Sequence, residues 1–137
     1  MNFIPLKQKF KKSQKGKSFN KITVLRKNLK FGQLGLKVLE HCRLTSKQIL
    51  ALYNNLKKKM KKRGSVLISV FPHTPISKKP TEVRMGKGKG GVAFWVAKLG
   101  AGATLCEIST FQKSFALKVL KRVRFKLPIK TKIILRS

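Results

Sequence analysis

Cations that alternate with glycine are the residues of this sequence best suited to chemistry. In the segment 80–91 the chain reads Arg84-Met85-Gly86-Lys87-Gly88-Lys89-Gly90. Glycine has no Cβ, so this backbone is free to adopt positive φ and to approach a partner closely, while Lys87 and Lys89 supply charge. Only Met85 is apolar in this string, and we therefore expect the segment to project as a loop. Such a loop suits closely spaced phosphate groups; the alternative is a mobile surface loop with solvated lysines.

The charge balance of the whole chain points to the same kind of partner. The 137 residues include 34 lysines and arginines but only 3 acidic residues, which gives a net charge of +31. Salt bridges to Glu40, Glu82 and Glu107 cannot neutralise this charge, so a compact chain needs anions from outside. Because the cations are spread along the sequence, we expect a polyanion that surrounds the protein, above all nucleic acid. An acidic membrane surface is the lesser candidate, and no apolar run approaches the ~18–20 residues that span a bilayer.

Catalysis and cofactor binding lack the residues that they need. The string that begins at Gly86 has neither the GxxxxGK[ST] spacing of a P-loop nor a predicted helix after it, and the sequence contains no aspartate. Paired carboxylates would have to come from three scattered glutamates, and no serine or cysteine nucleophile stands in a recognised motif. We therefore expect no enzyme and no cofactor.

Cysteine and histidine are too few and too scattered to form a metal site. Cys42 and Cys106 have no CxxC partner, and His41 and His73 do not complete a ligand set with them. We expect no metal, and two free thiols in a reducing compartment. The first 21 residues also lack the apolar region of a secretory signal.

The first 30 residues predict an extended basic arm. They carry ten lysines and arginines and no acid, and Phe3, Phe10, Phe19 and Leu25 are too widely spaced to form one apolar face. We expect this arm, residues 1–30, to be disordered alone and ordered by phosphate contacts. The alternative is a solubilising tail. A short strand is possible at 22–25.

Residues 31–137 predict a single domain, in which the clearest helix starts at Thr45. Thr45 and Gln48 fit a capping box, and Gly64 fits the residue that follows the end of a helix. The expected apolar stripe consists of Ile49, Tyr53, Leu56 and Met60. The end of this helix carries six cations, more than the helix dipole needs, which indicates phosphate binding. They are Lys57, Lys58, Lys59, Lys61, Lys62 and Arg63.

The other expected elements are mostly strands. Alternating apolar residues predict strands at 31–39, 65–71 and 92–99. Gly100-Ala101-Gly102 is expected to turn the last of these into a partner at 103–109. Gly32 and Gly35 would allow close backbone approach or a bulge. Three prolines, Pro72, Pro75 and Pro80, predict a rigid extended connection to the loop.

A second helix and a closing strand complete the expected domain. Thr110 is the expected cap of a helix that runs to about Arg124. Its predicted inward residues are Phe111, Phe115, Val119 and Val123, and its outward ones are Lys113, Lys118, Lys121 and Arg122. A basic-faced strand follows at 129–135. Two helices on one mainly antiparallel sheet make an α+β domain, in which we expect Phe94 in the core and Trp95 on the opposite face.

Several ordered motifs resemble one known family. They include Arg43-Leu44-Thr45-Ser46-Lys47-Gln48-Ile49, Val70-Phe71-Pro72, the loop string from Arg84 to Gly90, Trp95-Val96-Ala97 and Leu127-Pro128-Ile129-Lys130-Thr131. Together they resemble the large-subunit ribosomal protein of the bacterial L-sixteen family, which is shared with the archaeal and eukaryotic L-ten-e proteins. The likeness runs from end to end, and the loop string is its most specific part.

The resemblance implies a fold, a role and a set of binding residues. The fold would be of the α/β hammerhead type, in contact with large-subunit rRNA near the peptidyl-transferase region. The protein would contact neighbouring large-subunit ribosomal proteins, help to complete subunit assembly and help to position A-site and P-site tRNA through its loop. The implied tRNA-proximal residues are Arg84, Met85, Gly86, Lys87, Gly88, Lys89 and Gly90. The candidate rRNA-binding residues are Lys7, Lys9, Lys11, Lys12, Lys15, Lys17, Arg43, Lys58, Lys62, Arg63 and Lys130.

The sequence departs from the family pattern at a few positions. Leu50-Ala51-Leu52-Tyr53 replaces acidic and small residues, and His73 and Ser69 stand where an aspartate and an arginine are usual, which removes a local salt bridge of relatives. Plastid members tend to have serine at the position of Lys87. With the lysine-rich composition, this favours a mitochondrially encoded protein of the mitochondrial ribosome; the bacterial cytoplasm is the alternative. A free-standing basic RNA chaperone and a membrane-surface protein are the competing functions.

Overall fold

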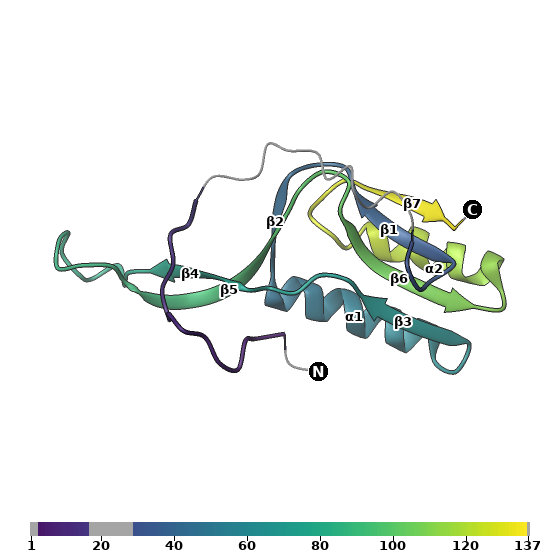
Figure 1. Cartoon of the computed structure of the whole chain (residues 1–137), viewed down its shortest axis with the longest axis horizontal. Coiled ribbons are helices and arrows are strands. Elements are labelled where there is room, and N and C mark those ends of the chain that lie inside the picture. Colours follow the sequence, from purple (N-terminus) through teal and green to yellow (C-terminus); the bar gives the residue numbers. More distant parts are fainter. Residues whose placement is uncertain (1–2, 17–28, 137) are drawn as a thin grey trace.

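The computed structural model describes residues 3–16 and 29–136 and contains two helices and two antiparallel sheets (Figure 1). The predicted α+β class is therefore confirmed, with two sheets in place of the single one expected. The strand expected at 22–25, Phe19 and Lys17 lie outside the described residues. The elements are β1 (Leu34–Val38), β2 (Cys42–Thr45), α1 (Ser46–Met60), β3 (Gly64–Ile68), β4 (Thr74–Lys78), β5 (Gly91–Leu99), β6 (Thr104–Thr110), α2 (Lys113–Arg124) and β7 (Thr131–Leu135).

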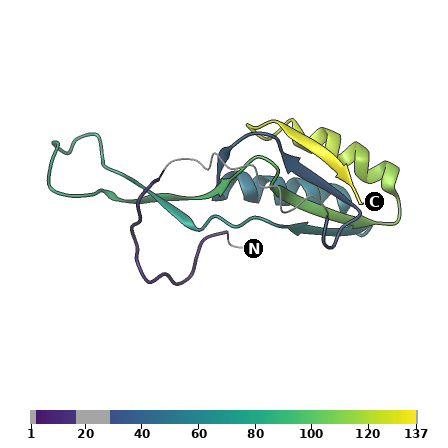
Figure 2. The same ribbon diagram turned by 45° about the horizontal axis from the view of Figure 1, so that its top comes forward.

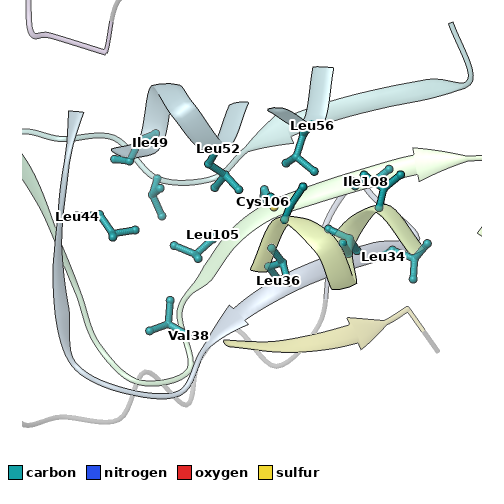
Figure 3. Close-up of a cluster of buried hydrophobic side chains, with 14 of the residues drawn as sticks. Leu34, Leu36, Val38, Leu44, Ile49, Leu52, Leu56, Leu105, Cys106 and Ile108 are labelled. Carbon is teal, nitrogen blue, oxygen red and sulfur yellow. The ribbon is translucent and has the colours of Figure 1, made fainter. Parts of the chain in front are cut away.

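The four-stranded sheet and the two helices form the body of the protein. The strand order is β3-β6-β1-β7, and α1 and α2 pack against each other and against this sheet. Figure 3 shows the shared apolar core, in which Leu34, Leu36 and Val38 of β1 and Ile49, Leu52 and Leu56 of α1 belong to one buried cluster. The predicted stripe on α1 is confirmed for Ile49, Leu56 and Met60, whereas Leu52 is buried and Tyr53 is only half-buried.

The two ends of α1 agree with the sequence to different degrees. At the start, the amide of Gln48 donates to Thr45 Oγ1 at 3.3 Å and the amide of Thr45 donates to Gln48 Oε1 at 2.9 Å, so the predicted capping box is confirmed. At the end, the prediction for Gly64 was wrong. Lys61 caps the helix with φ 45° and ψ −120°, and Gly64 begins β3 so close to β6 that a Cβ would lie 2.4 Å from the carbonyl oxygen of Ser109.

The second helix begins later than the sequence indicates. Thr110 ends β6, and its hydroxyl donates to the Arg63 carbonyl at 2.7 Å, so it is not the cap; Gln112 occupies that position without a side-chain hydrogen bond. Phe111 precedes the helix and is fully exposed, against the prediction, because it belongs to the connection from β6. The inward positions of Val119 and Val123 are confirmed, and Phe115 is half-buried.

The expected hairpin of β5 and β6 does not form, because the chain changes sheets between these strands. β5 pairs with β2 and β4, whereas β6 pairs with β1 and β3. At the crossing, the amide of Gly102 (φ 90°) donates to the Val38 carbonyl at 2.8 Å, which anchors the turn to β1. The pairing of β1 with β6 shifts in register after Leu36, which agrees with the irregularity expected near Gly35. The close approach expected at Gly32 is also present, because a Cβ added there would lie within 2.9 Å of the Ile108 backbone.

The three-stranded sheet β2-β5-β4, here called the ribbon, extends from the body and carries the glycine–lysine loop at its far end (Figures 1 and 2). The proline-rich connection contains β4, which the sequence did not predict, and β3 stops at Ile68, short of the expected Phe71. Pro75 is compatible with β4 because this strand lies at an edge of its sheet. Phe94 is 42% exposed and Trp95 is the more buried of the two, so the prediction of Phe94 as a core residue was wrong.

Candidate nucleic-acid interface

The loop between β4 and β5 presents its cations to solvent. Residues 81–89 are all exposed, and the Met85 side chain is fully so. Three consecutive residues have positive φ, namely Gly86 (97°), Lys87 (53°) and Gly88 (82°). Within the loop, the Lys79 ammonium donates to the Gly86 carbonyl. This geometry leaves Arg84, Lys87 and Lys89 able to meet an anionic partner without displacing any part of the body.

The foot of the loop is tightly packed, in contrast to its tip. A Cβ on Gly90 would lie 2.6 Å from the Lys78 carbonyl oxygen, whereas one on Gly86, Gly88 or Gly91 would meet nothing within 4 Å. Gly90 is therefore required for close approach of the two strands, and Gly86 and Gly88 for their backbone conformation. The glycines of this string thus have two different roles, close packing at the foot and positive φ at the tip.

The N-terminal arm, residues 3–16, lies beside the ribbon (Figures 1 and 2). The Gln8 side-chain amide donates to the His73 carbonyl at 3.1 Å, and the Arg43 guanidinium donates to the Gly16 carbonyl at 2.7 Å. An open groove of about 400 Å³ separates the two segments. Its lining comes from the arm (Gln8, Lys9, Phe10, Ser13, Gln14) and from the ribbon and the residue before it (His73, Thr74, Pro75, Lys98).

Phe3 anchors the start of the arm to the body. Its side chain is 6% exposed, belongs to the apolar core and meets the Tyr53 ring edge-on at a centroid distance of 6.1 Å. Sequence reasoning missed this contact because the phenylalanines of this basic segment are too widely spaced to show a periodicity. From this anchor, Lys7, Lys9, Lys11, Lys12 and Lys15 are all exposed.

The remaining candidate cations lie at two other places. Lys58, Lys62 and Arg63 are exposed at the end of α1, on the opposite side of the molecule from the loop (Figure 1). The Arg63 guanidinium lies 4.9 Å from the centroid of the Phe115 ring, which orients it. Lys130 stands before β7 and pairs with Glu40 at 3.3 Å. The structure therefore brings the arm, Arg43 and the loop together, and leaves the helix-end cations and Lys130 apart from them.

Few of the cations have an acidic partner inside the protein. The pair of Lys130 and Glu40 is the one salt bridge among the described residues, and both side chains are exposed. Glu82 lies exposed in the loop. Glu107 is buried and makes no salt bridge within the distance limit of an ion pair in the described part of the chain. The basic surface is thus left to attract anions from outside.

Glu107 has a structural role that its sequence position did not reveal. The side chain is 4% exposed, and its carboxylate accepts hydrogen bonds from the amides of Lys30 (3.3 Å), Phe31 (2.8 Å) and Gly32 (2.8 Å). Burial raises the pKa of Glu107, but the three amides and the nearby Arg136 outweigh it, so the net pKa lies below its ordinary value. This carboxylate holds the segment that leads into β1.

The thiols and histidines show no arrangement for chemistry. Burial raises the pKa of Cys106 to about 12, and burial together with Glu40 raises that of Cys42 to about 11, so both thiols are poorly reactive. Within residues 3–16 and 29–136, no cluster of three or more histidine, cysteine or acidic side chains has the geometry of a metal site. No helix in the described part of the chain could span a membrane.

Six phenylalanines are exposed among these cations. In the described ranges, at least two-fifths of the side-chain surface is accessible at Phe10, Phe31, Phe71, Phe94, Phe111 and Phe125. The Arg124 guanidinium lies 5.0 Å from the Phe125 ring centroid, and the Lys9 ammonium lies 5.6 Å from that of Phe10. Aromatic faces beside cations suit unstacked nucleobases as well as phosphates.

These features define a class of protein: a small, very basic α+β domain with a cationic loop on a ribbon, a basic arm beside it and a surface suited to a polyanion. The profile of the family described as "Ribosomal protein L16p/L10e" matches residues 5–134. The chain is 45% identical over 132 residues to "Large ribosomal subunit protein uL16" of Orientia tsutsugamushi (strain Boryong), covering 96% of both chains. It is 44% identical, with at least 95% of both chains covered, to the proteins of the same name from strain Ikeda and from Blochmanniella pennsylvanica (strain BPEN).

The chain therefore belongs to the ribosomal protein L16p/L10e family. The resemblance carried by the loop string and the other motifs is confirmed. The relatives named here are bacterial.

Proposed function

We propose that this chain is a structural constituent of the large ribosomal subunit and a component of the translation machinery that binds large-subunit rRNA by charge and shape. The observation that carries the proposal is membership of the family, together with relatives named as large-subunit proteins over almost their whole length. A net charge of +31 with one salt bridge among the described residues supports a surrounding RNA as the source of counter-charge. No catalytic role is part of the proposal.

The rRNA contacts that we propose come from three regions of the surface. The arm contributes Lys7, Lys9, Lys11, Lys12, Lys15 and Lys17, the ribbon contributes Arg43, and the body contributes Lys58, Lys62, Arg63 and Lys130. Apart from Lys17, which is not described, these are exposed or half-exposed side chains. Their distribution over opposite sides of the molecule supports embedding in RNA, with neighbouring ribosomal proteins at the remaining surface. A single docking face would need them to be gathered together.

The loop serves a second contact in this proposal. Arg84, Met85, Gly86, Lys87, Gly88, Lys89 and Gly90 reach toward A-site and P-site tRNA near the peptidyl-transferase region, and the protein helps to complete subunit assembly. The exposure of the loop at the end of a ribbon supports a reach beyond the body's own binding site (Figure 1). Phosphates of a mobile tRNA can then be contacted by charge without base reading.

Sedimentation tests the ribosomal assignment. A tagged full-length chain expressed in bacterial cells should co-migrate with large subunits on a sucrose gradient in ordinary salt and should be released only in high salt. A free-standing RNA chaperone would remain near the top of the gradient, and a membrane-surface protein would float with vesicles. Either of these outcomes would overturn the proposal.

The loop is tested separately from assembly. Replacing Lys87 by alanine should leave co-migration with large subunits unchanged and should weaken A-site tRNA binding by the purified ribosomes, because it removes one charge from the tip. Thr81→Ala, in the same exposed loop, is the matched control without charge loss. Normal tRNA binding by ribosomes with the Lys87→Ala chain would contradict the loop's proposed role.

We further propose the mitochondrial ribosome as the place of action, with the bacterial cytoplasm as the alternative. The lysine-rich composition supports an A+T-rich organellar genome, and the bacterial relatives are compatible with either compartment. Fractionation of the source cells decides between them: the chain should sediment with the mitochondrial ribosomes, and its presence only in a bacterial cytoplasmic fraction would select the alternative.

A further inference from the structure

The arm and the loop cross-link each other through two lysines that are 77 residues apart in the sequence. The Lys12 ammonium donates to the Lys89 carbonyl at 2.7 Å, and the Lys89 ammonium donates to the Ser13 carbonyl at 2.5 Å. Both views show the arm crossing the ribbon near the foot of the loop (Figures 1 and 2). Each lysine thus reaches the backbone of the other's segment, and both ammonium groups lie at the junction of the arm and the foot of the loop.

This pair of contacts is electrostatically incomplete. An ammonium group has three N–H donors, and each of these contacts uses one. The residues concerned are exposed. The only acidic side chain in the loop, Glu82, makes no salt bridge in the described structure. Two like charges therefore lie at one junction without a paired carboxylate, and an anion that accepts hydrogen bonds from both would offset their repulsion.

We propose that Lys12 and Lys89 form a site for one phosphate group of an RNA backbone, and that its occupancy fixes the N-terminal arm against the foot of the loop. This inference rests on the proposed function, because it names how the RNA that the protein binds would set the loop's position. Lys12 and Lys89 are positioning residues in this arrangement. The loop tip, which carries Arg84 and Lys87, is aimed by a contact made at its foot.

The surrounding contacts make this coupling specific to one place along the arm. On either side of Lys12, Gln8 bonds to the His73 carbonyl and Gly16 accepts from Arg43, so the arm is already tied to the ribbon at two further points. Lys78 is an exposed neighbour at the foot of the loop, where it pairs with Gly91, and its side chain makes no hydrogen bond to the arm in the described structure. It carries the same charge, belongs to neither proposed set of RNA contacts and supplies a matched control.

The distance between arm and ribbon can be followed by fluorescence in the full chain. Trp95 is the only tryptophan, and it pairs with Pro75, which lines the same groove as Gln14. A Gln14→Cys variant can be labelled with an acceptor of tryptophan fluorescence. The two native thiols react slowly, because the pKa of Cys42 is raised to about 11 and that of Cys106 to about 12.

The experiment titrates inorganic phosphate into the labelled protein, with chloride at equal ionic strength as the reference. Energy transfer should rise with phosphate. Lys12→Ala and Lys89→Ala should each increase the half-saturating phosphate concentration about fivefold or more, because each removes a charge-assisted hydrogen bond. The double variant should be no worse than either single one. Lys78→Ala should change the half-saturating phosphate concentration less than about twofold.

Two results would overturn the inference. One is a phosphate effect no larger than that of chloride; the other is an equal loss of phosphate affinity in the Lys78→Ala control, which would indicate diffuse charge attraction. The proposed function is judged apart from this, by sedimentation. A chain that co-migrates with large subunits but shows no dependence on Lys12 and Lys89 refutes only the phosphate site.

Discussion

The buried carboxylate of Glu107 holds the chain at the entry to β1 through three backbone amides. Glu107→Gln should lower the free energy of unfolding by about 1–3 kcal/mol, because the neutral amide loses charge-assisted bonds and turns an N–H group toward other donors. Urea denaturation at neutral pH measures the change. Glu40→Gln is the matched control, since its salt bridge is exposed and worth about 0–1 kcal/mol. Equal effects of the two substitutions would refute this role.

The same carboxylate predicts a pH dependence. The folded pKa of Glu107 lies below its ordinary value, so the unfolded chain binds more protons in this range and stability rises with pH. The stabilisation is complete above the unfolded pKa, about 4.3, and is lost as the pH falls through the lower folded value. Urea denaturation at a series of pH values below about 4.3 measures how steeply the free energy of unfolding rises with pH. This slope should be smaller in Glu107→Gln than in the original chain. Parallel curves would contradict the assignment.

The end of α1 contains a residue whose backbone conformation favours glycine. Lys61 has φ 45° and ψ −120°, a conformation that an L-residue adopts at a cost. Lys61→Gly should therefore raise the free energy of unfolding by about 0.5–1 kcal/mol, measured by the urea midpoint. Lys62→Gly removes the same charge at a position without positive φ and should not raise the free energy of unfolding. Destabilisation by Lys61→Gly would show that its charge or side chain matters more than its backbone.

At the scale of elements, the ribbon depends on one close contact at its far end. Gly90→Ala should force the foot of the loop apart, because the new Cβ would lie 2.6 Å from the Lys78 carbonyl oxygen. Gly91→Ala meets nothing within 4 Å and is the control. The test is energy transfer from Trp95 to an acceptor on Gln14→Cys, which should fall with Gly90→Ala and stay unchanged with Gly91→Ala. The same transfer in both variants would contradict a tight foot.

Local patterns predicted the elements well and their pairing poorly. The capping box at Thr45 and the alternation in β5 depend on neighbouring residues, and both are visible in the sequence. The change of sheets at Gly102 depends on a hydrogen bond to Val38, far away in the chain, and no local pattern encodes it. β4 was missed because Pro75 argues against a strand unless the strand is known to lie at an edge.

The candidate interface likewise has features that the sequence predicts and features that depend on contacts between distant residues. Charge and exposure of the loop follow from composition, since a string of glycine and lysine has little to bury. The position of the arm does not, because it depends on Phe3 entering the core and on side chains that bond to distant carbonyls. Glu107 was predicted only as one of three carboxylates, since its three amide donors become adjacent only in the folded chain.

At the scale of the whole molecule, the unbalanced charge predicts how the free protein binds RNA. The free protein should bind unrelated RNAs with little selectivity, and its affinity should fall steeply as salt is added. In a plot of log binding constant against log salt concentration, the slope should steepen by about 0.7–0.9 for each phosphate neutralised. Replacing Lys7, Lys9 and Lys11 by alanine should lower this slope by about 2–3. Filter binding to unrelated RNAs from low to moderate salt measures it. A slope unchanged by the triple replacement would show that the arm stays off the RNA.

The exposed phenylalanines affect a copy that has not yet met its RNA. Bare aromatic rings of different copies can stick together, and the surrounding positive charge can capture any stray nucleic acid. A surplus of newly made chains is therefore hazardous, and a cell must degrade it or shelter it with a helper protein. Production of this polypeptide is thus expected to keep pace with transcription of the RNA that covers it.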